Sequence, residues 1–289
     1  MSEVVERAVT PANTSSLIVN QIEPRIGAEI SGIDLRQPLT QAIRDELYQL
    51  LLKHRVLFFR DQFITYEQQE AFALNFGPLL EHVTSKKINQ EAKVAHQISA
   101  QAAREEYDIR FGRWHTDTSW QLTPGLGAVL RAVRIPEVGG DTLWANGAAV
   151  YEGLSDELKE KIDNLYVVHD YQKRLAKVDH KYPLVSHPLV LTHPDTGETI
   201  LFPNFSLNPS IVGWSKEESD KLLNELLLEY NRPEYQVRFK WRPGSVAFWD
   251  NRAGLHYAVQ NYGDFPRLME RVLIGSDHIP QRVRTPENG

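Results

Sequence analysis

The last third of the chain alternates between apolar, strand-like segments and turn residues, and this pattern restricts the fold more than any other feature. Residues 236–242 read QVRFKWR, in which Val, Phe and Trp alternate with Arg, Lys and Arg, and this is the period of a strand with one buried face. A Pro-Gly turn signal follows at 243–244. The segments 245–251 and 267–275 read as two further strands, so the pattern favours a β-sandwich or barrel.

Several other segments carry the spacing and end signals of helices. The predicted helices cover residues 40–54, 65–77, 155–165 and 215–230. The second begins at Thr65 and ends on Gly77, because glycine is typical of the position after a helix. The last combines Ser215 and Glu218 in the spacing of a capping box. We therefore expect an α+β fold that is mainly β, with helices packed around the sheets.

The composition is that of an ordinary globular protein. The chain has 289 residues and no cysteine, which excludes a disulfide framework and thiolate chemistry. A net charge of −6 without a dense Lys/Arg run argues against a nucleic-acid or membrane partner. There is no signal-peptide core and no apolar run of about 18 residues. We expect a cytoplasmic protein with a disordered segment at 1–16 and a single domain over 17–289.

The stretch RWHTDTSW, residues 113–120, contains the first candidate for chemistry. In an extended chain, His115 and Asp117 face the same way, so both side chains can reach one point in space. His256 lies at the end of a predicted strand, about 140 positions later. Two imidazoles and one carboxylate leave open positions on a metal, as in non-haem Fe(II) oxygenases. A tetrahedral zinc site with the same ligands is the competing interpretation.

Arg267 favours the oxygenase over a zinc- or manganese-dependent hydrolase. Oxidative decarboxylation of 2-oxoglutarate needs a cation for the far carboxylate, and arginine offers a permanently charged, bidentate clamp. Thr142 could add a hydroxyl to this grip. In a hydrolase, Arg267 has no clear role. A jelly roll that only binds a small molecule would tolerate the loss of a ligand, whereas all three are present here.

The chain resembles the TauD/TfdA family of Fe(II)- and 2-oxoglutarate-dependent dioxygenases from about residue 20 to residue 279. The resemblance rests on several motifs in order: RIGAEISGIDL, HRVLFFRDQ, FGPLLEH, WHTDTSW, VGGDTLWANGAAVYEGLS, VRFKWRPGSVAFWDNRAGLHYA and PRLMERVLIG. It implies a double-stranded β-helix (jelly-roll) core with surrounding helices. It also implies Fe(II) as the metal, with 2-oxoglutarate and O₂ as cosubstrates.

The same resemblance assigns roles to individual residues. His115, Asp117 and His256 become the iron ligands, and Thr142 and Arg267 bind 2-oxoglutarate. Within the family the chain is similar to taurine and alkylsulfonate dioxygenases. The substrate-binding residues that this similarity implies are His82, Tyr171, Phe205 and Arg271. In those enzymes the positions of His82 and Arg271 hold the sulfonate.

The amine-binding part of a taurine pocket is not matched. Phe111 and Ser85 stand where taurine enzymes have an asparagine and a tyrosine, and Arg113 replaces another asparagine. We expect a small anionic substrate, taurine or another alkylsulfonate, converted to aldehyde and sulfite while 2-oxoglutarate gives succinate and CO₂. The alternatives are an alkylsulfatase, an aryloxyalkanoate-type dioxygenase, or the metal-dependent hydrolase. Relatives in the family suggest a homo-oligomer, a dimer or a tetramer.

Overall fold

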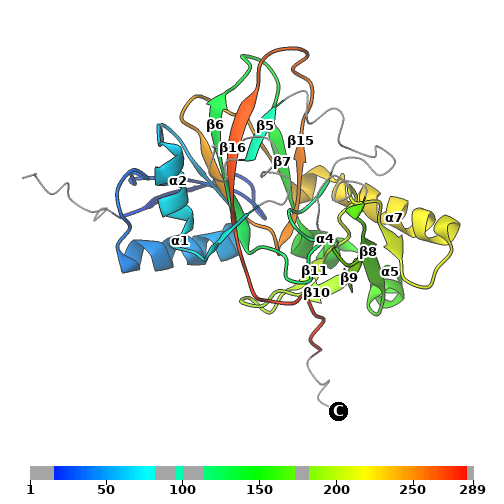
Figure 1. Ribbon diagram of the computed structural model, residues 1–289. Helices are drawn as coiled ribbons and strands as arrows, with labels where there is room; N and C mark the ends of the chain where they lie inside the picture. The colour runs from blue at the N-terminus through cyan, green and yellow to red at the C-terminus, as the bar shows by residue number, and fades with distance from the viewer. Residues whose placement is uncertain (1–15, 82–95, 100–113, 173–181, 285–289) are drawn as a thin grey trace, which may run out of the picture.

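The computed structural model describes residues 16–81, 96–99, 114–172 and 182–284, with side chains for all of these except 96–99. The expected disordered segment 1–16 lies outside the described residues, apart from Ser16. Within the described part, strands outnumber helices and the helices lie on two sides of the strands (Figure 1). The fold is therefore α+β and mainly β, as the sequence predicts.

The larger sheet has eight strands in the order β1-β2-β3-β14-β6-β16-β4, and β5 also pairs with β16. Its strands are β1 (Ile18–Gln21), β2 (Ala28–Ser31), β3 (Val56–Phe59), β4 (Leu79–Leu80), β5 (His96–Ser99), β6 (Gly127–Arg134), β14 (Val246–Asp250) and β16 (Leu268–Ile274). Strand β14 pairs with β3 on one side and β6 on the other, and all five of its side chains are buried. Burial on both faces explains its continuous apolar sequence.

A second sheet orders three strands as β13-β7-β15. They are β7 (Thr142–Asn146), β13 (Gln236–Phe239) and β15 (Gly254–Ala258). One core cluster joins this sheet to the larger one, because Trp144 and Phe239 pack with Phe58 of β3. The alternation in 236–242 has its expected meaning here: Val237 and Phe239 are buried and Arg238 is exposed.

Helices cover the two flanks of these sheets (Figure 1). They are α1 (Gln41–His54), α2 (Tyr66–Ala73), α4 (Gly147–Gly153), α5 (Asp156–Ile162), α7 (Lys216–Tyr230) and the 3₁₀ helix η3 (Pro233–Tyr235). Helices α1 and α2 share an apolar cluster with the larger sheet, whereas α4, α5 and α7 share another with β15. The remaining strands are β8 (Tyr166–His169), β9 (Val185–Pro188), β10 (Val190–Thr192), β11 (Thr199–Leu201) and β12 (Ser210–Ile211).

The predicted helix starts are confirmed, but two predicted ends are wrong, since α5 ends at Ile162 and not at residue 165. Thr65 and Ser215 each cap a helix, and both form a capping box. Helix α2, however, ends at Ala73 and not at Gly77. A Cβ on Gly77 would lie 2.9 Å from the Ile274 side chain, so close packing against β16 accounts for this glycine.

Gly254, the first residue of β15, is expected to be intolerant of a methyl group. A Cβ there would lie 2.0 Å from the backbone oxygen of Ala145 on β7, so Gly254→Ala must push the strands apart. We expect it to lower the free energy of unfolding by about 1–3 kcal/mol, as overpacking does. Urea denaturation measures this. Gly275→Ala is the control, since its nearest contact is 3.3 Å and its cost should be smaller. Equal costs would contradict the prediction.

Candidate metal centre and its neighbouring arginines

Two predicted ligands, His115 and His256, are held together by their own backbones. His256 lies on β15, and His115 forms an isolated antiparallel bridge with it. The His115 amide donates to the His256 carbonyl at 3.0 Å, and the His256 amide donates back at 2.7 Å. The two rings consequently lie 4.1 Å apart between centroids. A bridge of two hydrogen bonds thus fixes the spacing of two imidazoles from distant parts of the chain.

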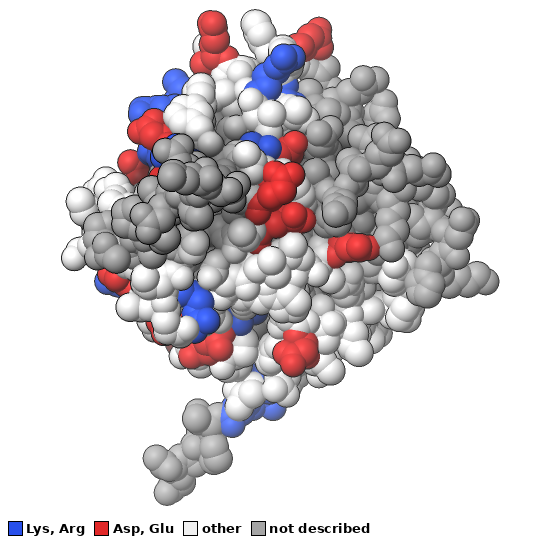
Figure 2. All heavy atoms as spheres, turned by 60° about the vertical axis from the view of Figure 1, so that its left-hand side comes forward, with Lys and Arg blue, Asp and Glu red and all other residues white. Residues whose placement is uncertain are grey.

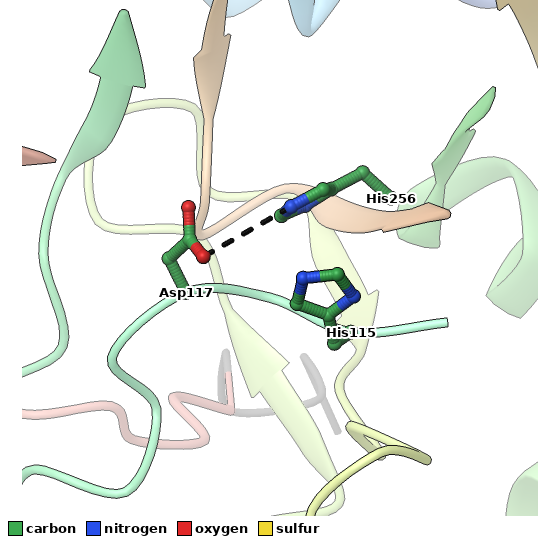
Figure 3. A group of neighbouring side chains, drawn as sticks. All are labelled: His115, Asp117 and His256. Atoms are coloured by element: carbon green, nitrogen blue, oxygen red, sulfur yellow. Dashed lines mark ion pairs between the residues drawn. The ribbon is translucent and has the colours of Figure 1, made fainter. Parts of the chain in front are cut away.

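Asp117 completes the group, as Figure 3 shows. One ligand atom from each of His115, Asp117 and His256 lies within 4.8 Å of the others. The Oδ1 atom of Asp117 is 4.0 Å from Nε2 of His256. Its Oδ2 atom is buried and accepts no hydrogen bond from the described residues. A buried carboxylate oxygen without a donor fits a cation as its partner.

The electrostatics of His256 suit metal binding. Burial, and then the neighbouring His115 and Arg271, lower the pKa of His256 well below its usual value. The imidazole is therefore neutral at neutral pH, with a lone pair available for a metal ion. Two imidazole nitrogens and one carboxylate oxygen are a donor set for a divalent transition metal with open positions. The residues present fit the iron site that the sequence predicts.

The ligand loop is held by a side chain that the sequence analysis did not single out, Asn251. The Thr116 hydroxyl donates to the Asn251 backbone oxygen at 2.6 Å. The side-chain oxygen of Asn251 accepts from the Asp117 amide at 3.4 Å and from the Trp249 indole at 2.8 Å. Asn251 directly follows β14, in the same FWDNRAGLHYA motif that supplies His256. Its place in that motif was the available signal.

The ligand loop also forms hydrogen bonds with side chains that lie far from it in the sequence. Asn204 donates to the Thr116 carbonyl at 2.9 Å. His169 hydrogen-bonds the Ser119 hydroxyl at 2.7 Å, and His187 hydrogen-bonds the Ser119 carbonyl at 2.8 Å. Burial, together with nearby His187, lowers the pKa of His169, so it acts as a neutral hydrogen-bonding group. Asn204, His169 and His187 therefore hold the ligand loop in place by hydrogen bonds to Thr116 and Ser119.

Replacing Asn251 by alanine is expected to weaken metal binding without unfolding the protein. The change removes the acceptor for the Asp117 amide, and partners that orient ligands typically contribute about 10- to 100-fold to metal affinity. The measurement is the Kd for Mn(II) by equilibrium titration. Asn231→Ala is the matched control, because Asn231 accepts from the Trp114 indole and touches no ligand. An unchanged Kd in Asn251→Ala would contradict this role.

Thr142 and Arg267 lie at one end of the smaller sheet. Thr142 pairs in register with Ala258, two residues beyond His256 on the same strand, so these residues share a face. The Thr142 hydroxyl accepts from the Trp241 indole at 3.0 Å. The buried Arg267 donates to the carbonyl of Gly140, two residues before Thr142, at 3.2 Å. The structure therefore brings both predicted 2-oxoglutarate residues to the same strand end.

Arg271 has a partner that the sequence did not predict. Its Nη1 atom lies 2.5 Å from Oδ1 of Asp117, and both side chains are buried. The neighbouring Glu270 pairs with Arg131 instead, because alternate residues of β16 face opposite sides. The predicted substrate arginine is thus in direct contact with a predicted metal ligand.

The remaining predicted substrate residues occupy different surroundings. Tyr171 stacks on Trp120 of the ligand segment, with ring centroids 5.3 Å apart. Phe205 is buried in the cluster that contains Trp114 and Leu255, the neighbours of the two ligand histidines. His82 lies outside the described residues, as do Ser85, Phe111 and Arg113. The substrate roles of His82, Tyr171, Phe205 and Arg271 stay predictions.

The described surface and helices add two observations. On the face drawn in Figure 2, basic side chains stand singly or in small groups among acidic ones. Among the helices that the structure describes, none has the length and apolar character needed to cross a membrane.

Comparisons with known proteins match nearly the whole chain. Residues 18–273 match the family described as taurine catabolism dioxygenase TauD, TfdA family. An alkylsulfatase of Acinetobacter baylyi is 36% identical, over 91% of this chain and 86% of the relative. An alpha-ketoglutarate-dependent sulfate ester dioxygenase of Pseudomonas putida is 34% identical, over 93% and 92%. The crystal structure of a putative alpha-ketoglutarate-dependent taurine dioxygenase from Burkholderia xenovorans is 40% identical, with a TM-score of 0.79 over 92% of this chain and 94% of that one.

Proposed function

The chain belongs to the TauD/TfdA dioxygenase family, and from this premise we propose that it oxidises the carbon next to a sulfonate or sulfate-ester group of a small organic anion. It is a 2-oxoglutarate-dependent dioxygenase that uses Fe(II) and O₂. Membership of this family decides between the two metal chemistries that the three ligands alone left open, in favour of the dioxygenase over the hydrolase.

In this proposal His115, Asp117 and His256 hold the iron. The bound Fe(II) supplies the activation of O₂ that is coupled to conversion of 2-oxoglutarate to succinate and CO₂. Arg267 clamps the far carboxylate of 2-oxoglutarate with its guanidinium, and Thr142 adds a hydroxyl. Asp117, His256, Thr142 and Arg267 are buried, whereas His115 is partly exposed.

The buried guanidinium of Arg271 is the observation that carries the substrate class. A charged side chain is rarely buried without partners, and Asp117 accounts for only one of its donors. The Arg271 Nε atom is buried and has no hydrogen-bond partner among the described residues. A sulfonate or sulfate group offers three acceptor oxygens and a negative charge for such donors. Its adjacent carbon would then lie beside the metal, positioned for oxidation.

The architecture and assembly that the family implies are part of the same proposal. We assign the larger sheet and the sheet β13-β7-β15 to a double-stranded β-helix, supported by the likeness to the Burkholderia xenovorans structure. A single domain over residues 17–289, a homo-oligomeric state and a cytoplasmic location stay predictions.

The test is oxygenated turnover of the Fe(II)-loaded protein with 2-oxoglutarate and one candidate substrate at a time. The panel contains taurine, hexanesulfonate, hexyl sulfate and a phenoxyacetate, and succinate, sulfite and sulfate are measured together. Oxidation of the carbon next to sulfur or ester oxygen gives an unstable product that collapses to an aldehyde. Sulfite is therefore expected from a sulfonate and sulfate from a sulfate ester, in equal amounts to the additional succinate.

The products that are formed distinguish the substrate classes. Sulfite release identifies a sulfonate dioxygenase, and a preference for hexanesulfonate over taurine fits the unmatched amine-binding positions. Sulfate release identifies an alkylsulfatase. Succinate formation stimulated only by phenoxyacetate moves the substrate to aryloxy acids and refutes the proposal. The same holds if no sulfur anion raises succinate formation above its level without substrate.

A further inference from the structure

We propose that Arg271 couples the anion site to the metal site: its guanidinium competes with the metal for the Asp117 carboxylate, so that binding of an oxyanion and binding of the metal strengthen each other. The inference rests on the proposed function for the identity of the anion. The pairing of Arg271 with Asp117 does not depend on the proposed function. Arg271 then has a second role beyond holding the substrate, as a positioning residue for a metal ligand.

One carboxylate oxygen of Asp117 lies near both Arg271 and the metal-ligand group. Oδ1 of Asp117 is 2.5 Å from Nη1 of Arg271 and 4.0 Å from Nε2 of His256. It therefore faces both the guanidinium and the space that the ligand atoms enclose. The other oxygen, Oδ2, has no donor among the described residues. A metal ion that recruits this carboxylate must share it with Arg271 or displace Arg271.

The charges determine the direction of the coupling. Without an anion, a divalent cation at the His115–Asp117–His256 group lies close to the positive charge of Arg271. Solvent screens the repulsion between the two charges only weakly, because the side chains of Arg271 and Asp117 are buried. An oxyanion on Arg271 offsets that charge and draws the guanidinium from the carboxylate. Metal affinity then rises, and by linkage the metal raises anion affinity by the same factor.

Two simpler roles for Arg271 predict different behaviour. If Arg271 only anchors the substrate, removing its charge leaves metal affinity in the absence of anion unchanged. If it only stabilises Asp117 as a structural ion pair, removing it loosens the ligand and weakens metal binding. Competition between Arg271 and the metal predicts the opposite, that Arg271→Gln binds the metal more tightly.

The experiment measures the Kd for Mn(II), from the electron paramagnetic resonance signal of the free ion, with 2-oxoglutarate present and no turnover. The probes are hexyl sulfate and hexanesulfonate, each added at saturation to the full-length protein. In the wild type we expect either anion to lower the Kd about fivefold or more, the lower end of typical coupling. Arg271→Gln is expected to show a Kd lowered to a similar extent without anion, and no further change with it.

Arg131→Gln is the matched control. Arg131 pairs with Glu270, the neighbour of Arg271 that faces the other side of β16. The control also removes an arginine from an ion pair but leaves Asp117 untouched, so the wild-type Mn(II) affinity and its response to the anion should persist. Arg271→Lys keeps the charge and should retain part of the response.

Two results overturn the inference. The first is an Arg271→Gln protein that binds Mn(II) equally or less tightly than the wild type. The second is an anion that binds the wild type, as calorimetry shows, without changing its Mn(II) affinity. If no sulfur anion binds at all, the proposed function fails, whereas the anion-free comparison still decides whether Arg271 competes with the metal. If Arg271→Gln does not fold, the wild-type response to the anion decides alone.

Discussion

Replacing His256 by alanine is expected to remove metal-dependent activity almost completely. The imidazole is one of three ligand atoms in a group that spans no more than 4.8 Å, so its loss leaves only His115 and Asp117. Removal of groups that merely orient ligands costs about 10- to 100-fold, and loss of a ligand should therefore exceed about 100-fold in Mn(II) affinity. Turnover with 2-oxoglutarate should fall to the level of the metal-free protein.

Equilibrium Mn(II) titration and succinate formation check this expectation. The backbone hydrogen bonds between residues 115 and 256 persist in the variant, so the fold should survive, as far-ultraviolet circular dichroism can show. His278→Ala serves as the control, because His278 follows β16 and is not part of the ligand group. A His256→Ala protein with wild-type metal affinity would refute the assignment of this ligand.

The second large effect concerns stability and a buried charge at the end of β14. Asp250 accepts from His193 at 3.0 Å and from Arg252 at 2.7 Å, and its side chain is completely buried. Asp250→Asn removes the negative charge and leaves the Arg252 guanidinium with Asp195 as its remaining acid. Breaking a buried pair from one side typically costs about 3–5 kcal/mol. Urea denaturation of the metal-free protein at pH 7 should show a loss of that size.

The pH dependence has a definite sign. Burial opposes ionisation of Asp250, but Arg252 and His193 outweigh it and hold the pKa well below its usual value. A depressed folded pKa contributes stability above the unfolded pKa and loses it as the pH falls. The difference between wild type and Asp250→Asn should therefore shrink by about 1.4 kcal/mol per pH unit below about pH 3.9.

Glu225→Gln is the control for the stability measurement. Its pair with Lys161 is 3.7 Å long and half exposed, and exposed pairs contribute at most about 1 kcal/mol. A loss from Asp250→Asn no larger than that of the control would show that the network around Asp250 adds little to stability.

The sequence predicted those parts of the structure that local rules determine. Helix starts at Thr40, Thr65 and Ser215 follow from side chains that cap their own helices. The alternating segment 236–242 contains strand β13, because period two fits only a sheet with one buried face. The prediction for Gly77 was wrong because a glycine can either end a helix or allow close packing of a neighbouring strand. Only tertiary contacts distinguish these two roles.

In the candidate site, too, local sequence rules predicted some features and missed those that depend on long-range contacts. His115 and Asp117 were predictable because two positions along an extended segment share a direction. The pairing of Arg271 with Asp117 was not, since it depends on β16 lying against a loop more than a hundred positions earlier. The same is true of Asn204 and His169, which reach the ligand loop from other parts of the fold. Patterns of residue type do not report such long-range contacts.

The bridge between His115 and His256 has a consequence for biosynthesis. A growing chain that has been made only as far as β7 contains two of the three predicted ligands, His115 and Asp117, and strand β15 with His256 comes much later. Binding at a site that the unfolded chain lacks adds to the free energy of folding only after the site exists. Iron therefore cannot guide the early steps of folding in this protein. Its uptake follows the pairing of β15, so any stabilisation of the fold by bound iron comes only after this strand is in place.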